Sequence, residues 1–197
     1  MKHGEVAKHT QNAEGEFYVV CDTGSYRFIQ VHTGTEEKVC QQCEKVIDSS
    51  VLERCFIPRF QKKKRFLGEW HLQNEILFPG YVFLITEHLD ELVDGLKQVS
   101  GMAKILKTGD DVTPLSQQEV ELLLKLGSER QEVEMSIGVI EGDKVHIFEG
   151  PLQGMEGLIR KIDRHKRMAY LEVEMFGRKI EMRAGLEIIE KITADEG

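Results

Sequence analysis

Four cysteines, Cys21, Cys40, Cys43 and Cys55, are the residues of this chain with the clearest capacity for chemistry. Cys40 and Cys43 form a C-x-x-C pair, a spacing that zinc sites use. The pair lies in a stretch whose apolar residues recur as on the buried face of a helix, so both thiols should point into a core. Because Cys21 and Cys55 stand alone, a full set of zinc ligands is not apparent. We expect buried, reduced cysteines and no metal.

The sequence lacks the usual catalytic motifs. It contains no phosphate-binding glycine loop and no G-x-S-x-G, and none of its seven histidines belongs to an H-E-x-x-H. The 34 Asp and Glu residues are scattered rather than paired by a local motif. We therefore expect a protein that is not an enzyme and needs no cofactor.

Local clusters of basic residues offer a different chemistry, binding to nucleic acid. The 26 Lys and Arg against 34 Asp and Glu give a net charge of −8, which excludes a polyanion binder acting through bulk charge. A predicted hairpin tip could contact DNA phosphates through Arg59, Lys62, Lys63, Lys64 and Arg65. A predicted barrel edge could bind RNA through Lys144, Arg160, Lys161, Arg164, His165, Lys166, Arg167, Arg178 and Lys179. The alternative for both clusters is solvated surface charge.

The apolar run at 76–85 predicts a strand with two different faces. Tyr81, Phe83 and Ile85 share one face, and Val82 and Leu84 share the other. If helices cover the Val82 and Leu84 face, the aromatic side chains must meet a second apolar surface, as a docking site for a protein helix would require. The alternative is that both faces are simply core.

The elements that must position these residues follow from the apolar periodicity. Strands are expected at 17–21, near 55–60, at 70–72, at 76–85 and at 105–106. Helices are expected around 39–47 after a Thr33–Glu36 capping box, over 89–99 with Thr86 as N-cap, and from a Ser116–Glu119 capping box through 126. The order β-α-β-β-α-β-α indicates an α+β domain with helices packed on an antiparallel sheet.

The last third of the chain changes to an all-β pattern. Leu171, Val173 and Met175 alternate with glutamates, and glycine turns separate several short strands, which predicts a small barrel that stays β-folded. We divide the chain into a disordered tail at 1–15, a first domain at 16–126, a linker at 127–137, a barrel at 138–192 and a tail at 193–197. No apolar run is long enough for a membrane helix and no secretion signal is present, so we expect a cytoplasmic protein without a membrane partner.

Several segments resemble the NusG family of bacterial transcription elongation factors. They are FYVV at 17–20, GTEEKV at 34–39, LFPGYV at 77–82, and GDKV at 142–145 leading into EGPLQGMEG at 149–157. Within the family, GPLQGMEG, the ILKTGDDVTPLS stretch at 105–116 and the ending at 185–191 most resemble the specialised LoaP-type processive antiterminators. Phe17 stands where the family usually has a tryptophan, and its aromatic role can persist.

The resemblance implies a fold and a set of partners. It implies an N-terminal NGN-like domain that binds the clamp helices of RNA polymerase, linked to a C-terminal SH3-like β-barrel, the KOW domain. It places the polymerase contact on Tyr18, Phe78, Tyr81, Phe83 and Ile105. In LoaP-type factors the KOW domain binds structured RNA, here a hairpin in a nascent leader. Non-template DNA is a further candidate partner for the hairpin tip, and we expect a monomer.

Two alternatives stay open at this point. A general NusG-type elongation factor would bind a ribosomal or termination protein through its KOW domain, and it predicts an apolar barrel groove without RNA affinity. A stand-alone RNA-binding or translation module would bind RNA but not polymerase. The basic cluster at 160–167 favours the LoaP-type hypothesis over the first alternative, and the aromatic strand favours polymerase binding over the second.

Overall fold

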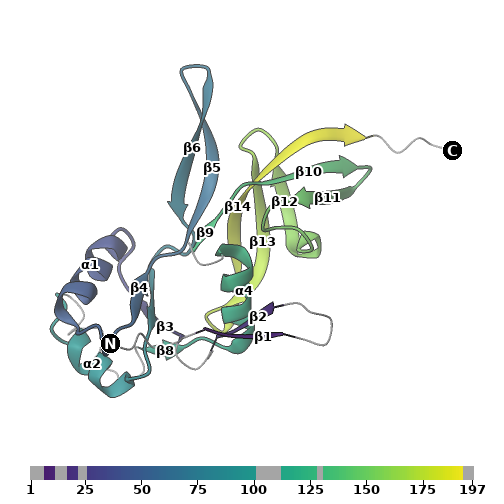
Figure 1. Cartoon of the computed structure of the whole chain (residues 1–197). Helices are drawn as coiled ribbons and strands as arrows, with labels where there is room; N and C mark the ends of the chain where they lie inside the picture. The colour runs from purple at the N-terminus through teal and green to yellow at the C-terminus, as the bar shows by residue number, and fades with distance from the viewer. Residues whose placement is uncertain (1–6, 12–16, 22–25, 101–111, 128–130, 193–197) are drawn as a thin grey trace.

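The first domain is built on a four-stranded antiparallel sheet with helices on both faces (Figure 1). The computed structural model describes residues 7–11, 17–21, 26–100, 112–127 and 131–192, the first two segments by their backbone alone. The sheet has the order β4-β7-β3-β8 and consists of β3 (Tyr26–Gln30), β4 (Arg54–Phe56), β7 (Tyr81–Ile85) and β8 (Thr113–Pro114). Helices α1 (Glu36–Val46) and α2 (Leu89–Leu96) cover one face, and α4 (Gln117–Gly127) lies on the other. The predicted α+β class is confirmed.

Strand β7 divides the interior into two cores. Val82 and Leu84 are fully buried and join α1 and α2 in one apolar cluster. Phe83 and Ile85 point the other way, into a cluster that continues through α4 into the second domain. The predicted alternation along β7 is therefore confirmed, because α1 and α2 cover the face of Val82 and Leu84 and the barrel domain meets the face of Phe83 and Ile85.

The predicted capping boxes have different outcomes. The Ser116 N–H donates to Glu119 Oε2 at 2.7 Å and the Glu119 N–H to Ser116 Oγ at 3.3 Å, which confirms the box that begins α4. The Thr33–Glu36 box is wrong, because Thr35 is the N-cap and makes no side-chain cap bond. The Glu36 carboxylate instead accepts the N–H groups of Gly34 and Gly80, at 2.6 and 2.7 Å.

The start of α2 also differs from the prediction. His88 is the N-cap of this helix, and Thr86 lies in the turn that leads to it. There the Thr86 hydroxyl accepts the His88 N–H at 2.9 Å and donates to the Val51 carbonyl at 2.6 Å. Its side chain therefore stabilises the turn rather than the helix end.

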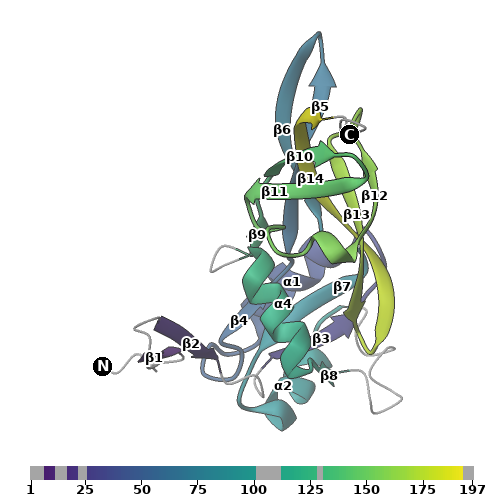
Figure 2. The ribbon, with the colours of Figure 1, turned by 90° about the vertical axis from the view of Figure 1, so that its right-hand side faces the viewer.

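A long β-hairpin extends from the first domain beside the barrel (Figures 1 and 2). This arm consists of β5 (Arg59–Phe66) and β6 (Glu69–Ile76), with the short strand β9 (Glu132–Val133) parallel to β5. Its turn falls at Leu67 and Gly68, whose φ angles are +50° and +87°. The expected position of the whole basic run in the hairpin turn is therefore wrong, since these cations lie along β5 in the ladder with β6, and only Lys64 and Arg65 lie near the turn.

The second domain is a five-stranded β-structure, as predicted. Its strands follow the order β11-β10-β14-β13-β12, with β10 and β14 parallel and the other pairs antiparallel. They are β10 (Ser136–Glu141), β11 (Lys144–Glu149), β12 (Ile159–Asp163), β13 (Met168–Met175) and β14 (Arg178–Ile192), with a 3-10 turn at Glu156–Leu158. Leu171, Val173 and Met175 point inward from β13 and are nearly inaccessible to solvent.

Two further strands pair near the N-terminus. β1 (Ala7–Gln11) and β2 (Phe17–Cys21) run antiparallel, with Ala7 opposite Cys21. β2 is the predicted first strand, whereas β1 lies in the segment expected to be a disordered tail. Backbone pairing with β2 gives that polar segment a structure that its composition does not indicate.

The strand predicted at 105–106 lies outside the described residues. In the described ranges, no helix has the length and apolar character to cross a membrane.

Candidate functional site

Four aromatic side chains gather on the face of the first sheet that α1 and α2 leave uncovered. We call Phe28, Phe78, Tyr81 and Phe83 the aromatic face. Phe28 and Phe83 are register partners on β3 and β7, and Phe78 precedes the turn that begins β7. The turn needs Gly80, whose φ of +85° is rarely adopted by other residues and whose N–H binds the Glu36 carboxylate. This turn fixes where Tyr81 emerges.

The aromatic face is covered by one side chain of the second domain, Phe176. Its ring stacks on Tyr81 with 3.7 Å between centroids and an interplanar angle of 4°. Phe28 and Phe78 meet the same ring edge-on, at centroid distances of 4.8 and 5.5 Å, and Phe83 lies 5.9 Å away. Clusters of this kind stabilise through buried apolar area and favourable ring geometry together.

Phe176 belongs to the turn between β13 and β14, which we call the tip (residues 176–178). Phe176 and Gly177 both have positive φ, +59° and +66°. A bulky residue in the left-handed region costs about 1–2 kcal/mol, so contacts outside the turn must hold it there. Two polar contacts flank the stacked ring. The Gly177 N–H donates to Glu119 Oε1 at 3.0 Å, and Arg178 Nη2 donates to the Tyr81 hydroxyl at 2.9 Å.

The structure brings together three of the five residues expected to bind polymerase, namely Phe78, Tyr81 and Phe83. Tyr18 lies on β2, of which the structure describes only the backbone, and Ile105 lies outside the described residues. The sequence analysis missed Phe28, Glu119 and Phe176 at this surface. Phe28 could have been found from strand alternation, but nothing local to Glu119 or Phe176 indicates a partner in the other domain.

Two groups of basic residues of the barrel lie at opposite ends of β13. Arg164, His165, Lys166 and Arg167 form the turn between β12 and β13, which we call the basic turn. Arg178 follows the far end of β13, roughly 23 Å away along this eight-residue strand. The expected extension of the basic patch to Arg178 is therefore wrong, because that arginine contacts Tyr81.

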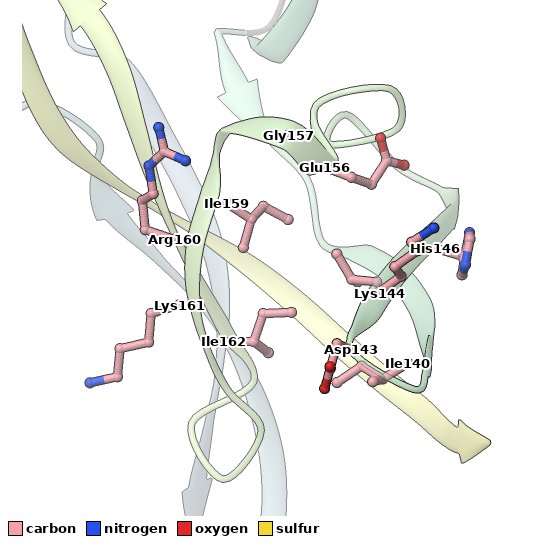
Figure 3. A pocket seen from close by; sticks show the side chains of 11 residues that line it. Ile140, Asp143, Lys144, His146, Glu156, Gly157, Ile159, Arg160, Lys161 and Ile162 are labelled. Atoms are coloured by element: carbon pink, nitrogen blue, oxygen red, sulfur yellow. The ribbon is translucent and has the colours of Figure 1, made fainter. Parts of the chain in front are cut away.

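A β-bulge in β12 determines the direction of the Arg160 and Lys161 side chains. The register of β12 against β13 shifts between Ile159 and Lys161. As a result Arg160 and Lys161 both point away from the side to which Ile159 and Ile162 point (Figure 3). On the outer side, Arg160 and Lys179 lie 3.2 and 3.4 Å from Glu172 Oε1. The hydrogen bond from Arg160, followed by that from Lys179, lowers the pKa of the exposed Glu172 carboxyl.

An open groove of about 730 Å³ lies on the inner side of β12 (Figure 3). Its apolar lining is Ile140, Val145, Ile159 and Ile162, and its polar lining consists of the cations Lys144, Arg160 and Lys161 together with Asp143, His146 and Glu156. Three of the predicted RNA-binding residues, Lys144, Arg160 and Lys161, thus line this groove beside its four aliphatic side chains. The aliphatic part of this surface suits an apolar segment of a protein.

Most of the cations expected to bind DNA are neutralised at the base of the arm. Arg59 pairs with Glu37, Lys62 with Glu75, and Lys63 with Glu187 of the barrel. Lys64 and Arg65 are exposed and lie next to the turn of the arm. That turn also carries exposed apolar side chains, since Phe66 is 63% and Leu67 87% accessible.

Three cysteines meet between α1 and β4. Cys40, Cys43 and Cys55 are buried and reduced, and the thiols of Cys40 and Cys43 both hydrogen-bond with that of Cys55. These bonds, the one to Cys40 foremost, and burial raise the pKa of Cys55, whereas the bond from Cys55 lowers that of Cys43. The expected burial is confirmed, but Cys55 is not isolated as expected. Across the described ranges, no group of His, Cys, Asp or Glu side chains has the arrangement to hold a metal ion.

Comparison with known proteins agrees with this two-domain arrangement. The family described as Transcription termination factor nusG matches residues 24–124, half of the chain. The Transcription termination/antitermination protein NusG of Staphylococcus carnosus strain TM300 is 29% identical over 181 residues, covering 87% of this chain and 98% of that protein. The protein of the same description from Staphylococcus aureus strain Mu50 has the same identity and coverage. A solved structure described as Domain interaction in Thermotoga maritima NusG superposes with a TM-score of 0.53 at 25% identity, over 83% of this chain and 93% of that chain.

The fold and these matches define a two-domain transcription factor. The chain belongs to the NusG family. It is a NusG-type transcription termination/antitermination factor.

Proposed function

We propose that the chain is a LoaP-type antiterminator that binds the clamp helices of RNA polymerase through the aromatic face. The observation that carries this proposal is that Phe176, from the other domain, contacts all four rings of that face and stacks on Tyr81. A cover made by another domain can leave without unfolding the sheet beneath it. The uncovered face would offer Phe28, Tyr81 and Phe83 as a rigid aromatic surface, the kind that supplies hot spots in protein interfaces.

Polymerase binding at this face requires the tip to withdraw. Phe176 and a polymerase helix would contact the same rings, so the docked tip and bound polymerase exclude each other. The solved Thermotoga maritima NusG structure is described as a domain interaction in that protein. Such an interaction supports a docked state as one of the states in which this chain functions.

The second half of the proposal assigns structured leader RNA to the basic turn. Arg164, His165 and Lys166 are exposed in the turn that joins β12 and β13. Asp163 opposes them, but its carboxylate is occupied by the Lys166 N–H, the main reason that its pKa is lowered. Arginine and lysine at a projecting turn can pair with phosphates and reach into an RNA groove.

Non-template DNA is the partner we propose for the outer part of the arm. Lys64 and Arg65 are exposed there beside Phe66 and Leu67. A cation next to an exposed aromatic ring suits single-stranded nucleic acid, which offers both phosphates and stackable bases. The ion pairs of Arg59, Lys62 and Lys63 assign the inner part of the arm to structural contacts instead.

One observation favours a second candidate function for the barrel. The aliphatic groove lined by Ile140, Val145, Ile159 and Ile162 fits the general-factor alternative, in which the KOW domain binds a ribosomal or termination protein. The groove shares Arg160 and Lys161 with the predicted RNA-binding cluster but includes no residue of the basic turn, so substitutions confined to Arg164, Lys166 and Arg167 leave its lining intact.

The test combines purified RNA polymerase with the leader RNA of the operon beside the gene. A variant with Arg160, Lys161, Arg164, Lys166 and Arg167 all changed to Gln should fold, bind polymerase and lose RNA binding. As a control, changing Lys38 and Lys45, two exposed cations of α1, to Gln should leave RNA affinity unchanged. Full RNA affinity and full antitermination by the five-fold variant would refute the RNA assignment and favour the general-factor function.

A further inference from the structure

One residue of the basic turn differs from its neighbours. The side chain of Arg167 is only 23% exposed, whereas that of Lys166 is 71% exposed. The Arg167 guanidinium carbon lies 3.9 Å from the centre of the Trp70 ring, on the arm of the first domain. Its Nη1 atom lies 2.8 Å from Glu187 Oε1. One face and one edge of the guanidinium are therefore already occupied.

Glu187 links this arginine to the arm a second time. Its Oε1 atom binds Arg167, and its Oε2 atom binds Lys63 on β5. The order of contacts is thus Lys63 of the arm, Glu187 and Arg167 of the barrel, and Trp70 of the arm. We call these four residues the seam. Two of its contacts, Lys63–Glu187 and Trp70–Arg167, join the two domains.

An RNA phosphate would compete for the same arginine. A phosphate pairs with the planar edge of a guanidinium much as a carboxylate does, so it would replace Glu187 at Arg167. A polyanion close to the turn would also repel Glu187 and draw Arg167 away from Trp70. RNA bound through Arg167 therefore removes the seam contacts that involve this side chain.

The seam and the tip are two separated places at which the barrel contacts the first domain, and between them Arg183 of β14 lies over the Phe60 ring of the arm. Arg167 immediately precedes β13, and Phe176 immediately follows it. When one of two linked contacts opens, the other loses the high effective concentration that the first provided. Opening of the seam should therefore promote release of Phe176 from Tyr81.

We propose that leader RNA opens the chain by taking Arg167 from the seam, so that RNA binding and uncovering of the aromatic face are coupled. The inference rests on the proposed RNA binding at the basic turn. Linkage makes the effect reciprocal: the docked seam must weaken RNA binding by the same factor by which RNA favours the open state. A variant of the arm that frees Arg167 should consequently bind RNA more tightly, although it lies in the other domain.

Trp70 provides a direct probe, because it is the single tryptophan of the chain. Titration of the full chain with the leader hairpin should shift the indole emission to longer wavelength as Arg167 leaves and water reaches the ring. In protein labelled with 3-fluorotyrosine, the same titration should move the fluorine signal of Tyr81 toward its position in Phe176→Ser. Tyr81→Phe identifies that signal.

Matched variants of the arm test the coupling. Trp70→Ala should raise affinity for the hairpin by about 3- to 10-fold, the range of a partly exposed cation–π contact. Trp70→Phe, which keeps an aromatic ring under Arg167, should lie near wild type. Leu72→Ala, which truncates another exposed apolar residue of β6, should leave affinity unchanged. Arg167→Gln should weaken RNA binding and abolish the response of Tyr81.

The outcomes separate the inference from the function on which it rests. If the hairpin binds while the Tyr81 signal stays in place and Trp70→Ala has wild-type affinity, RNA binding stands and the coupling is refuted. If neither the wild type nor Trp70→Ala binds the hairpin or heparin, the RNA function fails and the inference fails with it.

Discussion

The Phe176 ring of the barrel lies parallel to the Tyr81 ring of the first domain, with 3.7 Å between their centroids. Phe176 occupies a turn position that favours Asn or Gly, and its φ of +59° is unfavourable for an aromatic residue. The backbone cost is offset by contacts with four rings of the other domain. The tip therefore has the shape needed to cover the aromatic face rather than the shape that best closes a hairpin.

The hydroxyl of Tyr81 should matter for docking but not for polymerase binding. Tyr81→Phe removes the hydrogen bond from Arg178 and keeps the ring, so docking should weaken by about 0.5–1.5 kcal/mol. The docked fraction can be measured by NMR of the fluorotyrosine- or methyl-labelled chain. Arg178→Gln is the matched variant from the opposite side, and a wild-type docked fraction in both would show that this bond contributes nothing.

Glu119 should have two separable roles, because its two oxygens bind different elements. Oε2 accepts the Ser116 N–H in the capping box, and Oε1 accepts the Gly177 N–H of the tip. Glu119→Ala should cost about 1 kcal/mol in unfolding free energy of the first domain and also weaken docking. Ser116→Ala should cause a similar loss of stability with little change in docking. Equal docking in the two variants would contradict a role for Glu119 at the tip.

At Gly185 the barrel backbone lies close to the backbone of the arm. A Cβ atom at this position of β14 would lie 2.4 Å from the Gln61 carbonyl oxygen and 2.1 Å from the Met135 sulfur. Gly185→Ala should therefore separate the barrel from the arm while each domain stays folded. Small-angle scattering should show a larger radius of gyration than in the wild type. Gly157→Ala is the control, because nothing lies within 4 Å of a Cβ there. A wild-type radius in Gly185→Ala would show that the contact between Gly185 and Gln61 tolerates the added methyl group.

Substitutions at the two ends of β13 should have different effects on RNA affinity. Arg164→Gln should reduce affinity for the leader hairpin, by about 1–3 kcal/mol if the side chain pairs with a guanine. Lys166→Gln should weaken all RNAs similarly, by about 1 kcal/mol or less, and reduce the salt dependence. Arg178→Gln should leave the RNA affinity of an open variant such as Phe176→Ser unchanged, since this arginine lies at the far end. Filter binding at several salt concentrations checks all three, and a strong loss in Arg178→Gln would place the RNA elsewhere.

Sequence reasoning succeeded where the determining physics is local. The alternation of Tyr81 to Ile85 follows from strand geometry, and the Ser116–Glu119 capping box involves neighbours in the chain. It failed where a distant residue decides the outcome. Glu36 was predicted to cap a helix together with Thr33, but the loop at Gly80 supplies an N–H to its buried carboxylate.

The basic run of the arm shows the same limit. Lys62 and Lys63 have the composition of a solvated turn, yet they extend a strand because Glu75 and Glu187 neutralise them. Glu187 belongs to the other domain, so its proximity cannot be predicted from the run itself. The cover of the aromatic face is also non-local, since Phe176 belongs to the other domain.

The most direct test of the proposed polymerase site compares the affinity of purified RNA polymerase for the wild type and four variants of the chain. Phe176→Ser should bind more tightly than wild type, because burial of this ring favours the docked state by about 2 kcal/mol. Phe148→Ser, at an exposed phenylalanine of β11, should bind like wild type. Tyr81→Asp should bind at least about 2 kcal/mol more weakly than wild type, even when combined with Phe176→Ser. If Tyr81→Asp in the open background kept the affinity of Phe176→Ser, the aromatic face would not be the polymerase site.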